Sequence, residues 1–274
     1  MSSAATDTIN EYEPLLLALQ DVLGVVVPQG QRVNMLERIK PLLSTYKLDS
    51  FTSLAESLRD DSAADVRSNV LDVISQRESS WVISPDMKRL LHDYIFDQVP
   101  ENASIWLVGC GKGQLAYAIA IEIAEFLNRS KANKKFQMVA TDSNNEKIER
   151  ANTATYNEAE MAGLSPDYRK LYSAKSGTDG SYQLKNRISE LVRFEQCNLL
   201  EDIQSMGKMD LIICPDVLVY FSIETKKQIL RQFSKVLNAG GVLMGTGNQV
   251  ALPNNQFFER VDHPAGVFYR QLGK

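Results

Sequence analysis

The chain has 274 residues, of which 44% are hydrophobic and 23% charged, and its formal net charge is −4 at pH 7. This is ordinary globular composition, which excludes disordered and low-complexity proteins, and the mild acidity argues against a nucleic-acid binder. No apolar run reaches the length of a membrane-spanning helix, and the first residues lack the basic start and apolar core of a signal peptide. Three widely spaced cysteines indicate reduced thiols. We therefore expect a cytoplasmic protein that is not inserted in a membrane.

The two histidines leave little material for a metal site or a catalytic triad, so no metal is expected. His92 and His263 have no partners nearby in the sequence, and we expect them at the surface or at a cap. Cys110 and Cys214 follow predicted strands without a CxxC motif, and we expect both to be small buried hydrophobic residues.

The first third of the chain predicts a helical domain, placed at residues 1–90. Apolar residues recur there at helical spacing, and Asp49-Ser50 offers a cap for the third helix. The apolar sets of the first three predicted helices span 15–23, 35–43 and 51–58, and the fourth predicted helix covers 62–75.

Residues 91–274 alternate between short apolar strands and amphipathic helices, which predicts an α/β domain with a doubly wound parallel sheet. Two final strands, at about 257–261 and 267–271, would close the sheet as an antiparallel hairpin. The segment at about 156–190 is polar and fits no βα unit, so we expect an insert that serves as a lid or binding element. The other predicted strands are 104–109, 135–141, 192–195, 209–214 and 242–245, and the predicted helices are 114–128, 144–154 and 224–237.

A glycine-rich loop, Gly-Cys-Gly-Lys-Gly at residues 109–113, joins the first strand of this domain to its first helix. Glycines there let the main chain turn tightly and approach a ligand, and the helix N-terminus offers N–H donors. Gln114 stands where a dinucleotide-binding fingerprint needs its third glycine, and no Ser or Thr follows as in a phosphate-binding Walker loop. The alternative is a tight turn without a ligand.

Asp142 ends the second predicted strand, at the sheet edge where open α/β proteins bind ligands. Its carboxylate can accept hydrogen bonds from both hydroxyls of a ribose. The alternative is that Asp142 caps the following helix. Together with the glycine loop, the acid predicts a ligand that carries adenosine without a pyrophosphate, and S-adenosylmethionine (SAM) is the obvious candidate.

Several longer stretches carry a specific resemblance: Trp-Leu-Val-Gly-Cys-Gly-Lys-Gly at 106–113, Ala-Thr-Asp at 140–142, Val-Arg-Phe-Glu-Gln-Cys-Asn-Leu at 192–199, Asp-Leu-Ile-Ile-Cys at 210–214 and Val-Leu-Val-Tyr-Phe at 217–221. With these motifs the chain resembles the CheR-type chemotaxis receptor methyltransferases over nearly its whole length. The resemblance implies a Rossmann-like SAM-binding domain with a helical N-terminal domain and a small β insert. It also implies transfer of a methyl group from SAM to glutamate side chains on chemoreceptor signalling helices, with S-adenosylhomocysteine (SAH) as product.

The resemblance assigns roles to individual residues. Asp142 and the Asn198-Leu199 pair would hold the adenosine, and Tyr220 occupies the family's active-site tyrosine position. The Tyr220 hydroxyl would orient a carboxylate, and the alternative is an aromatic lid over the pocket. The implied cofactor-binding set is Ser79, Gly109, Cys110, Gly111, Asp142, Asn198, Leu199 and Asp216.

The chain departs from the family where charges are expected. Ile83 stands at the arginine position beside the cofactor and the substrate carboxylate, Gln114 and Leu115 replace two glutamates, and Pro215 replaces an arginine. Loss of one charge-assisted contact costs about 1.5–3 kcal/mol. Two alternatives therefore stay open: a different methyl acceptor, such as another protein substrate, or a non-catalytic signalling module that binds SAM or SAH.

A locally basic stretch lies in the second predicted helix region. In the family the corresponding region faces the acidic receptor helices, and the alternative is a solvated helix face. Its four basic residues are Arg32, Arg38, Lys40 and Lys47.

Overall fold

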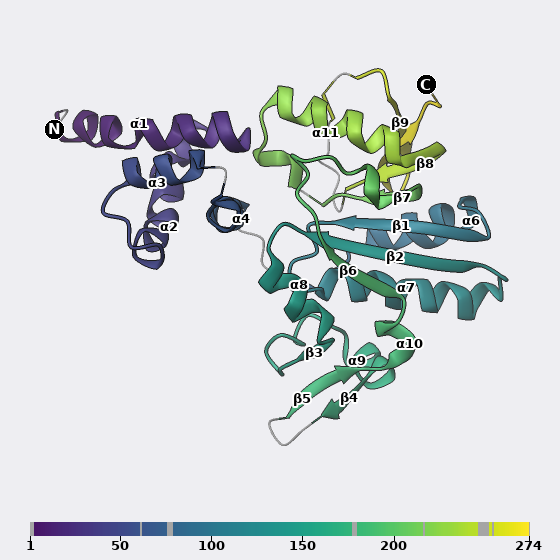
Figure 1. The fold of residues 1–274 in the computed structure, drawn as a ribbon. Coiled ribbons are helices and arrows are strands. Elements are labelled where there is room, and N and C mark those ends of the chain that lie inside the picture. Colours follow the sequence, from purple (N-terminus) through teal and green to yellow (C-terminus); the bar gives the residue numbers. More distant parts are fainter. Residues whose placement is uncertain are drawn as a thin grey trace. The chain divides into compact units, whose positions relative to one another are not determined.

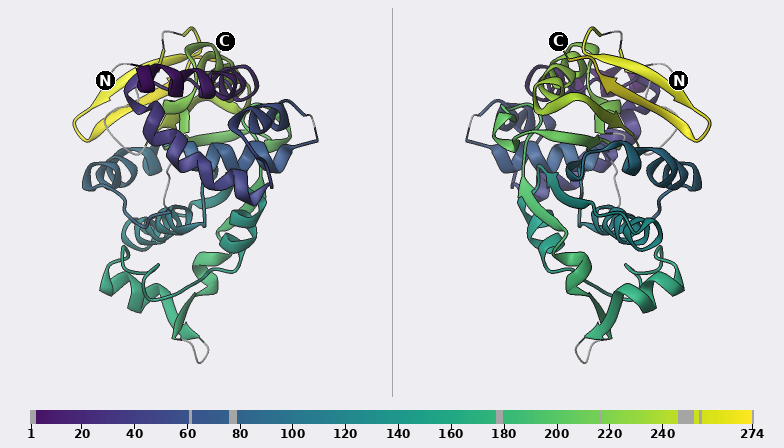
Figure 2. Two further views of the ribbon diagram at one scale, coloured as in Figure 1. Left: turned by 90° about the vertical axis from the view of Figure 1, so that its left-hand side faces the viewer. Right: turned by 90° about the vertical axis from the view of Figure 1, so that its right-hand side faces the viewer.

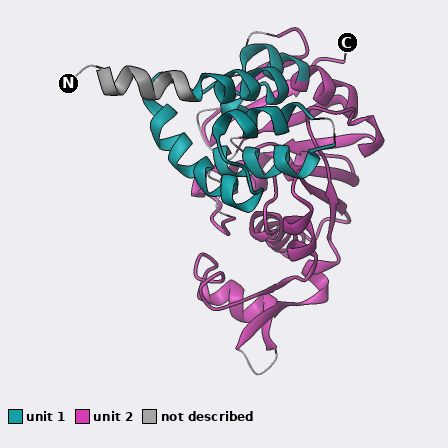
Figure 3. Ribbon diagram, turned by 60° about the vertical axis from the view of Figure 1, so that its left-hand side comes forward, with its two compact units in different colours: residues 1–77, 218–228 teal, residues 78–217, 229–274 magenta. Residues whose placement is uncertain are grey.

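The computed structural model of the chain describes residues 3–60, 62–75, 79–176, 180–215, 217–245, 252–253 and 255–273, with the main chain alone at 3–11 and 75 (Figure 1). Two compact units emerge (Figure 3). Unit 1 comprises Met1–Arg77 and Leu218–Gln228, and unit 2 comprises Glu78–Val217 and Ile229–Lys274. The boundary at residue 90 and the insert limits at 156 and 190 stay predictions from the sequence.

Unit 1 is helical, as predicted from its apolar spacing. Leu19, Ile39 and Leu54 from three of its helices are fully buried. Ser50 caps the third helix, because its Oγ accepts the Ser53 N–H at 3.1 Å. The elements are α1 (Ser3–Leu23), the 3₁₀ turn η1 (Gln29–Gln31), α2 (Arg32–Thr45), α3 (Phe51–Arg59) and α4 (Ala64–Ser75).

Unit 2 contains a seven-stranded sheet in the order β6-β2-β1-β7-β8-β10-β9. The first five strands in this order run parallel, and β10 is antiparallel to both β8 and β9. Figure 2 shows the β9–β10 hairpin in yellow. The predicted doubly wound α/β fold and its closing hairpin are confirmed. The strands are β1 (Asn102–Val108), β2 (Lys135–Asp142), β6 (Val192–Gln196), β7 (Met209–Ile213), β8 (Leu237–Met244), β9 (Phe258–His263) and β10 (Gly266–Gln271).

Helices pack on both faces of the sheet because its central strands are apolar on both sides. Ile105 and Leu107 of β1 point into the cluster that also holds the buried residues of α7 (Gln114–Ser130). Trp106 points to the opposite face, where its ring meets Phe233 of α11 (Ile223–Val236) at a centroid distance of 5.4 Å. The remaining elements outside the insert are α5 (Pro85–Leu90), the π-helical turn η2 (Leu91–Ile95), α6 (Phe96–Gln98), α8 (Asn145–Asn152), η3 (Gln204–Met206) and η4 (Val217–Tyr220).

The predicted insert forms a second, three-stranded antiparallel sheet in the order β3-β5-β4. The short helix α9 in this insert was not predicted from the sequence. It begins after Ser165, whose Oγ accepts the Tyr168 N–H at 3.2 Å. No helix within the described ranges is long and apolar enough to cross a membrane. The elements of the insert are β3 (Thr155–Tyr156), α9 (Pro166–Tyr172), β4 (Ser173–Ser176), β5 (Ser181–Leu184) and α10 (Asn186–Ser189).

Candidate functional site

The glycine loop lies between the end of β1 and the start of α7, as predicted, and its three glycines all have positive φ: +66° at Gly109, +55° at Gly111 and +92° at Gly113. A Cβ added to Gly111 would lie 2.3 Å from Ser79 Oγ. A Cβ on Gly113 would lie 2.9 Å from Tyr156 Oη and 2.9 Å from Ala151 Cβ. Both glycines are therefore required for conformation and for space.

The N–H groups of residues 110–113 all donate to acceptors within the protein. Cys110 N–H donates to the Thr141 carbonyl at 2.8 Å, and Gly113 N–H donates to the Cys110 carbonyl at 3.0 Å. Gly111 N–H donates to Asp142 and Lys112 N–H donates to Ser79 Oγ, at 2.8 and 2.7 Å. With these donors engaged, the loop is not arranged as a phosphate cradle, which would need N–H groups turned toward the anion.

Asp142 is the last residue of β2 and is 8% exposed. Its Oδ2 accepts the Gly111 N–H at 2.8 Å, and its Oδ1 accepts the Asn144 N–H at 3.1 Å. A carboxylate has about four acceptor sites, so capacity for two hydroxyl donors remains. The cap of α8 is Asn144, whose Oδ1 accepts the Glu146 N–H at 2.9 Å. The alternative that Asp142 caps this helix is therefore wrong.

The end of β6 brings the Asn198-Leu199 pair to the same sheet edge. Gln196 pairs with Asp142 in register, and the Cys197 N–H donates to the Asp142 carbonyl at 3.0 Å. The Asn198 side chain braces the turn, since its Oδ1 accepts the Leu200 N–H at 3.1 Å. Leu199 is buried. We call residues 109–113, Asp142 and residues 197–199 the cofactor edge.

Two further groups at the cofactor edge bear on its chemistry. Burial, with the nearby carboxyl groups of Glu201 and Glu195, raises the pKa of the Cys197 thiol to about 11, so it stays protonated and is no nucleophile at neutral pH. Gln114 begins α7 directly after the glycine loop and is 3% exposed, and its Oε1 has no hydrogen-bond partner among the described residues. A buried acceptor left unpaired indicates a donor that the protein itself does not provide.

The segment before α5 lies against the glycine loop. Ser79 Oγ accepts the Lys112 N–H, and the Trp81 ring packs edge-on against Tyr156 at 5.1 Å. Ile83, at the position where the resembling family has arginine, is partly buried against the apolar core of unit 2. Apolar burial of this kind provides no charge for a substrate carboxylate.

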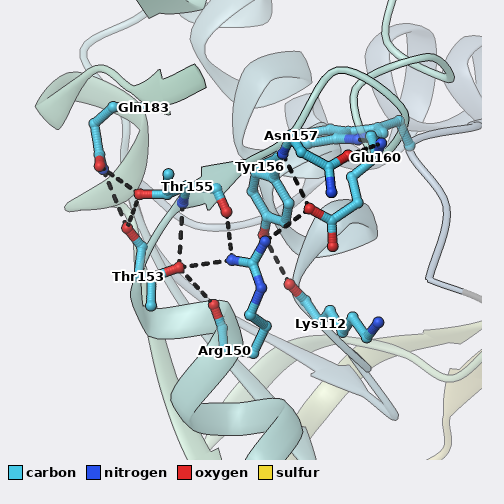
Figure 4. Close-up of polar contacts among 9 residues, drawn as sticks. Lys112, Arg150, Thr153, Thr155, Tyr156, Asn157, Glu160 and Gln183 are labelled. Carbon is cyan, nitrogen blue, oxygen red and sulfur yellow. Dashed lines mark hydrogen bonds and ion pairs between the residues drawn. The ribbon is translucent and has the colours of Figure 1, made fainter. Parts of the chain in front are cut away.

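The insert is bonded to the glycine loop through Tyr156 (Figure 4). Its hydroxyl donates to the Lys112 carbonyl at 2.7 Å, and the Arg150 guanidinium lies over its ring at 5.1 Å. Arg150 also forms an ion pair with Glu160 at 2.7 Å. Burial raises the pKa of the Tyr156 phenol above its ordinary value, so it remains a donor. The loop conformation is therefore fixed from the insert as well as from Ser79.

Tyr220 lies in η4 and belongs to unit 1, in the segment Leu218–Gln228. The other predicted site residues that the structure describes belong to unit 2. Asp216 lies outside the described residues.

His92 is buried, so the prediction of a surface or capping role is wrong for this residue. It belongs to a polar cluster with Glu122, which is also buried, Lys88, which is half-buried, and Arg129, which is exposed. Glu122 Oε2 lies 2.7 Å from His92 Nε2, and Glu122 Oε1 accepts from Lys88 Nζ at 3.0 Å. Arg129 Nη2 lies 3.1 Å from His92 Nδ1. Guanidinium only donates, so His92 Nδ1 is the acceptor in the contact with Arg129.

His263 behaves as expected, since its Nδ1 accepts the Ala265 N–H at 3.1 Å in the β9–β10 turn. Cys110 and Cys214 are buried, as predicted.

The family model described as "CheR methyltransferase, SAM binding domain" matches residues 78–267. The chain belongs to this CheR family. It is 28% identical over 273 residues to the "Chemotaxis protein methyltransferase" of Vibrio parahaemolyticus, covering 98% of this chain and 99% of the relative. It is also 28% identical to "Chemotaxis protein methyltransferase 1" of Pseudomonas aeruginosa, with the same coverage. "Chemotaxis protein methyltransferase 1" of Vibrio cholerae is 27% identical, again with 98% and 99% coverage.

As a CheR-family member, the chain is a SAM-dependent methyltransferase with S-adenosylmethionine as its cofactor. The cofactor edge fits this group. Its loop is not arranged for phosphate, its buried Asp142 has acceptor capacity left, and the unpaired Gln114 Oε1 matches the ammonium group of a methionine moiety. In the sequence, Gln114 stands out only as the loss of a charge, and the burial of its Oε1 without a hydrogen-bond partner among the described residues is visible only in the structure.

Proposed function

We propose that this chain transfers the methyl group of SAM to the side-chain carboxylate of a glutamate in chemoreceptor signalling helices. The observation that carries the proposal is the cofactor edge, where Asp142 accepts one main-chain N–H on each oxygen and keeps capacity for two ribose hydroxyls. The receptor as partner is supported by three relatives of nearly equal length whose names describe chemotaxis protein methyltransferases.

Different residues of the cofactor edge would bind different parts of the cofactor. Asp142 would bind the ribose, the turn at Asn198 and Leu199 would hold the adenine, and residues Gly109, Cys110 and Gly111 would line the ligand with main chain. Ser79 would act by fixing the loop, and Gln114 Oε1 would accept from the ammonium group. When bound, SAM supplies an electrophilic methyl carbon on a positively charged sulfur. Asp216 completes the proposed set.

The acceptor side needs alignment rather than a base. A glutamate carboxylate is already ionised at neutral pH, so no proton has to be removed before it attacks. Holding the carboxylate oxygen in line with the methyl carbon and the sulfur is the main contribution left to the protein. Tyr220 would provide it by donating one hydrogen bond to the carboxylate. Ile83 provides no second, charged contact, so we expect alignment to rest more heavily on Tyr220 than it would beside an arginine.

Transfer of label from methyl-labelled SAM to a chemoreceptor signalling domain tests the proposal. We expect alkali-labile label on the domain, and none on a matched domain in which the methylated glutamates are replaced by glutamine. Tyr220→Phe should lower kcat about tenfold, by loss of one hydrogen bond to a charged group, and leave the SAM dissociation constant unchanged. Binding of SAM and SAH without label on any receptor domain would contradict the proposed acceptor. Absence of binding would contradict the proposed site.

Of the basic residues predicted to face the receptor, we propose only a part for that role. Arg38 Nη1 donates to the Val73 carbonyl at 3.3 Å, and Arg32 Nε lies 3.5 Å from the Val27 carbonyl. These two arginines therefore have contacts within unit 1, and the exposed Lys40 is the better candidate for a receptor contact. A cytoplasmic location suits a partner of this kind and stays a prediction from the sequence.

A further inference from the structure

The segment that carries Tyr220 leaves the methyltransferase sheet and joins the helical unit. The strands on either side of it in sequence, β7 and β8, belong to unit 2, whereas Leu218–Gln228 is grouped with Met1–Arg77 in unit 1 (Figure 3). The chain returns to unit 2 along α11, whose first residues are in unit 1 and whose last are in unit 2. The main chain at Tyr220 is thus held by contacts within unit 1.

Those contacts come from the short stretch between α1 and η1. Val25 and Phe221 form an antiparallel bridge. The Val26 N–H donates to the Tyr220 carbonyl at 3.2 Å, and the Ser222 N–H donates to the Gly24 carbonyl at 2.7 Å. Two main-chain hydrogen bonds therefore bracket the bridge, one at Tyr220 itself and one two residues later.

Gly24 is fitted closely to this arrangement. Its φ is +61°, and a Cβ built on it would lie 2.2 Å from Thr225 Oγ1 and 2.9 Å from Thr225 Cγ2. The N–H groups of Gly24 and Val25 both bond to the last turn of α1, to Gln20 and Leu19 at 3.0 Å each. The end of α1 is in this way connected, bond by bond, to the main chain of Tyr220.

We propose that Gly24 and Val26 are positioning residues for methyl transfer, which fix the main chain of Tyr220 and thereby the place of its hydroxyl. This inference rests on the proposed function, in which Tyr220 orients the acceptor carboxylate. Displacement of a reacting or orienting group by about 1 Å can lower a rate by as much as about 100-fold. Loosening of the bridge should therefore appear in kcat and leave cofactor binding unchanged, since the cofactor edge lies wholly in unit 2.

Val26→Pro tests the inference, because proline lacks the N–H that bonds to the Tyr220 carbonyl. Val25 before it is in an extended bridge, the conformation that a residue preceding proline favours. Val26→Ala is the matched control, since it keeps the N–H and shortens a side chain that is 49% exposed. We expect Val26→Pro to lower kcat about tenfold with an unchanged SAM dissociation constant, and Val26→Ala to stay within about twofold.

A double-mutant cycle with Tyr220→Phe separates positioning from general damage. If the bridge acts through the hydroxyl, Val26→Pro should have little further effect on kcat in the Tyr220→Phe background. An equal loss in both backgrounds would overturn the inference, as would equal kcat values for Val26→Pro and Val26→Ala. Wild-type kcat for Tyr220→Phe would instead contradict the proposed role of Tyr220, so the two failures are distinguishable.

A second series decides the matter if Val26→Pro does not fold. Gly24→Ala forces a Cβ against Thr225, and Thr225→Ala removes the Oγ1 and Cγ2 atoms that it would meet. We expect Gly24→Ala to lower kcat at unchanged SAM affinity and Gly24→Ala/Thr225→Ala to restore a part of it. Normal kcat for folded Gly24→Ala, or a kcat loss without any recovery in the double variant, would overturn the inference.

Discussion

The main chain of the cofactor edge in unit 2 and the main chain around Tyr220 in unit 1 are hydrogen-bonded in different ways. At the cofactor edge, the N–H groups of residues 110–113 donate to acceptors from β2, from the loop itself and from the segment before α5. In the segment Leu218–Gln228, the Tyr220 carbonyl accepts the Val26 N–H and the Ser222 N–H donates to the Gly24 carbonyl, so both of these bonds lead to residues 24–26. The main chain of the cofactor edge is thus held from several elements of unit 2, and that of Tyr220 is held in part from the stretch that follows α1 in unit 1.

The largest effect is expected from Gly113→Ala, which tests how tightly the cofactor edge is packed. The new Cβ would lie 2.9 Å from both Ala151 Cβ and Tyr156 Oη, at a φ of +92°. Strain and overpacking together should cost about 2–4 kcal/mol of unfolding free energy and weaken SAM binding. Urea denaturation and calorimetry with SAM would measure the two effects.

Gly180→Ala is the matched control for this change. Gly180 has a φ of +75°, and a Cβ there would meet nothing within 4 Å. It should cost only the left-handed backbone penalty, about 1 kcal/mol, without any change in SAM affinity. Equal costs for the two variants would show that the cofactor edge is no more tightly built than an open turn.

Asp142→Ala should have the next largest effect, which we expect on the affinity for SAM. It removes the acceptor of the Gly111 and Asn144 N–H groups and the proposed ribose ligand. SAM affinity should fall by about 1–3 kcal/mol, measured by calorimetry on folded protein. Asp210→Ala is the control, because Asp210 also accepts a main-chain N–H, from Ser104 at 2.9 Å, but lies near the start of β7. Unchanged affinity in Asp142→Ala would remove the ribose assignment.

The sequence predicted most of the fold because local patterns encode it. The strand at β1, the glycine loop and the helix α7 follow from apolar runs and glycine spacing, and parallel pairing then brings the ends of β1, β2 and β6 to one edge. Asp142 could be placed there from its position at a strand end alone. Its bonds to Gly111 and Asn144 could not be predicted, because they depend on the turn that the loop takes in three dimensions.

The features that the sequence did not show depend on partners far along the chain. His92 was expected at the surface because its contacts, Glu122 and Arg129, come from α7, 30 and 37 residues later. The bridge between Val25 and Phe221 joins residues nearly 200 positions apart. Neither pairing produces a periodic pattern or a motif of fixed spacing in the sequence. Hydropathy and turn residues therefore could not predict these contacts.

A smaller effect, on stability, is expected at the polar cluster around the buried Glu122 of α7. Burial alone would raise the pKa of the Glu122 carboxyl, but the hydrogen bonds from His92 and Lys88 and the Lys88 charge outweigh it and hold the pKa below the ordinary 4.5. Glu122 therefore stabilises the fold fully above its unfolded pKa, and this contribution is lost as the pH falls through the lowered folded value.

Glu122→Gln should accordingly lower the unfolding free energy by about 1.5 kcal/mol at neutral pH, measured by urea denaturation. The gap from the unchanged protein should close in acid, as the pH falls through the lowered folded pKa of Glu122. Glu101→Gln, at an exposed site, is the control and should leave the curve within about 0.5 kcal/mol. A gap that persists unchanged in acid would mean that the carboxylate charge is not the source of the stability.

The smallest effect is expected from Ile83→Arg, which tests the proposed acceptor. Ile83 is partly buried beside the core, at the position where the family has an arginine, and the guanidinium can grip a carboxylate with two parallel hydrogen bonds. If the acceptor is a receptor glutamate, kcat/KM for a receptor domain should be unchanged or rise, up to about tenfold. Val82→Arg adds the same charge at a neighbouring side chain that is 66% exposed and should change nothing. A large loss in Ile83→Arg with normal Val82→Arg would mean that the surroundings of residue 83 are shaped around an apolar group and do not admit a charged side chain.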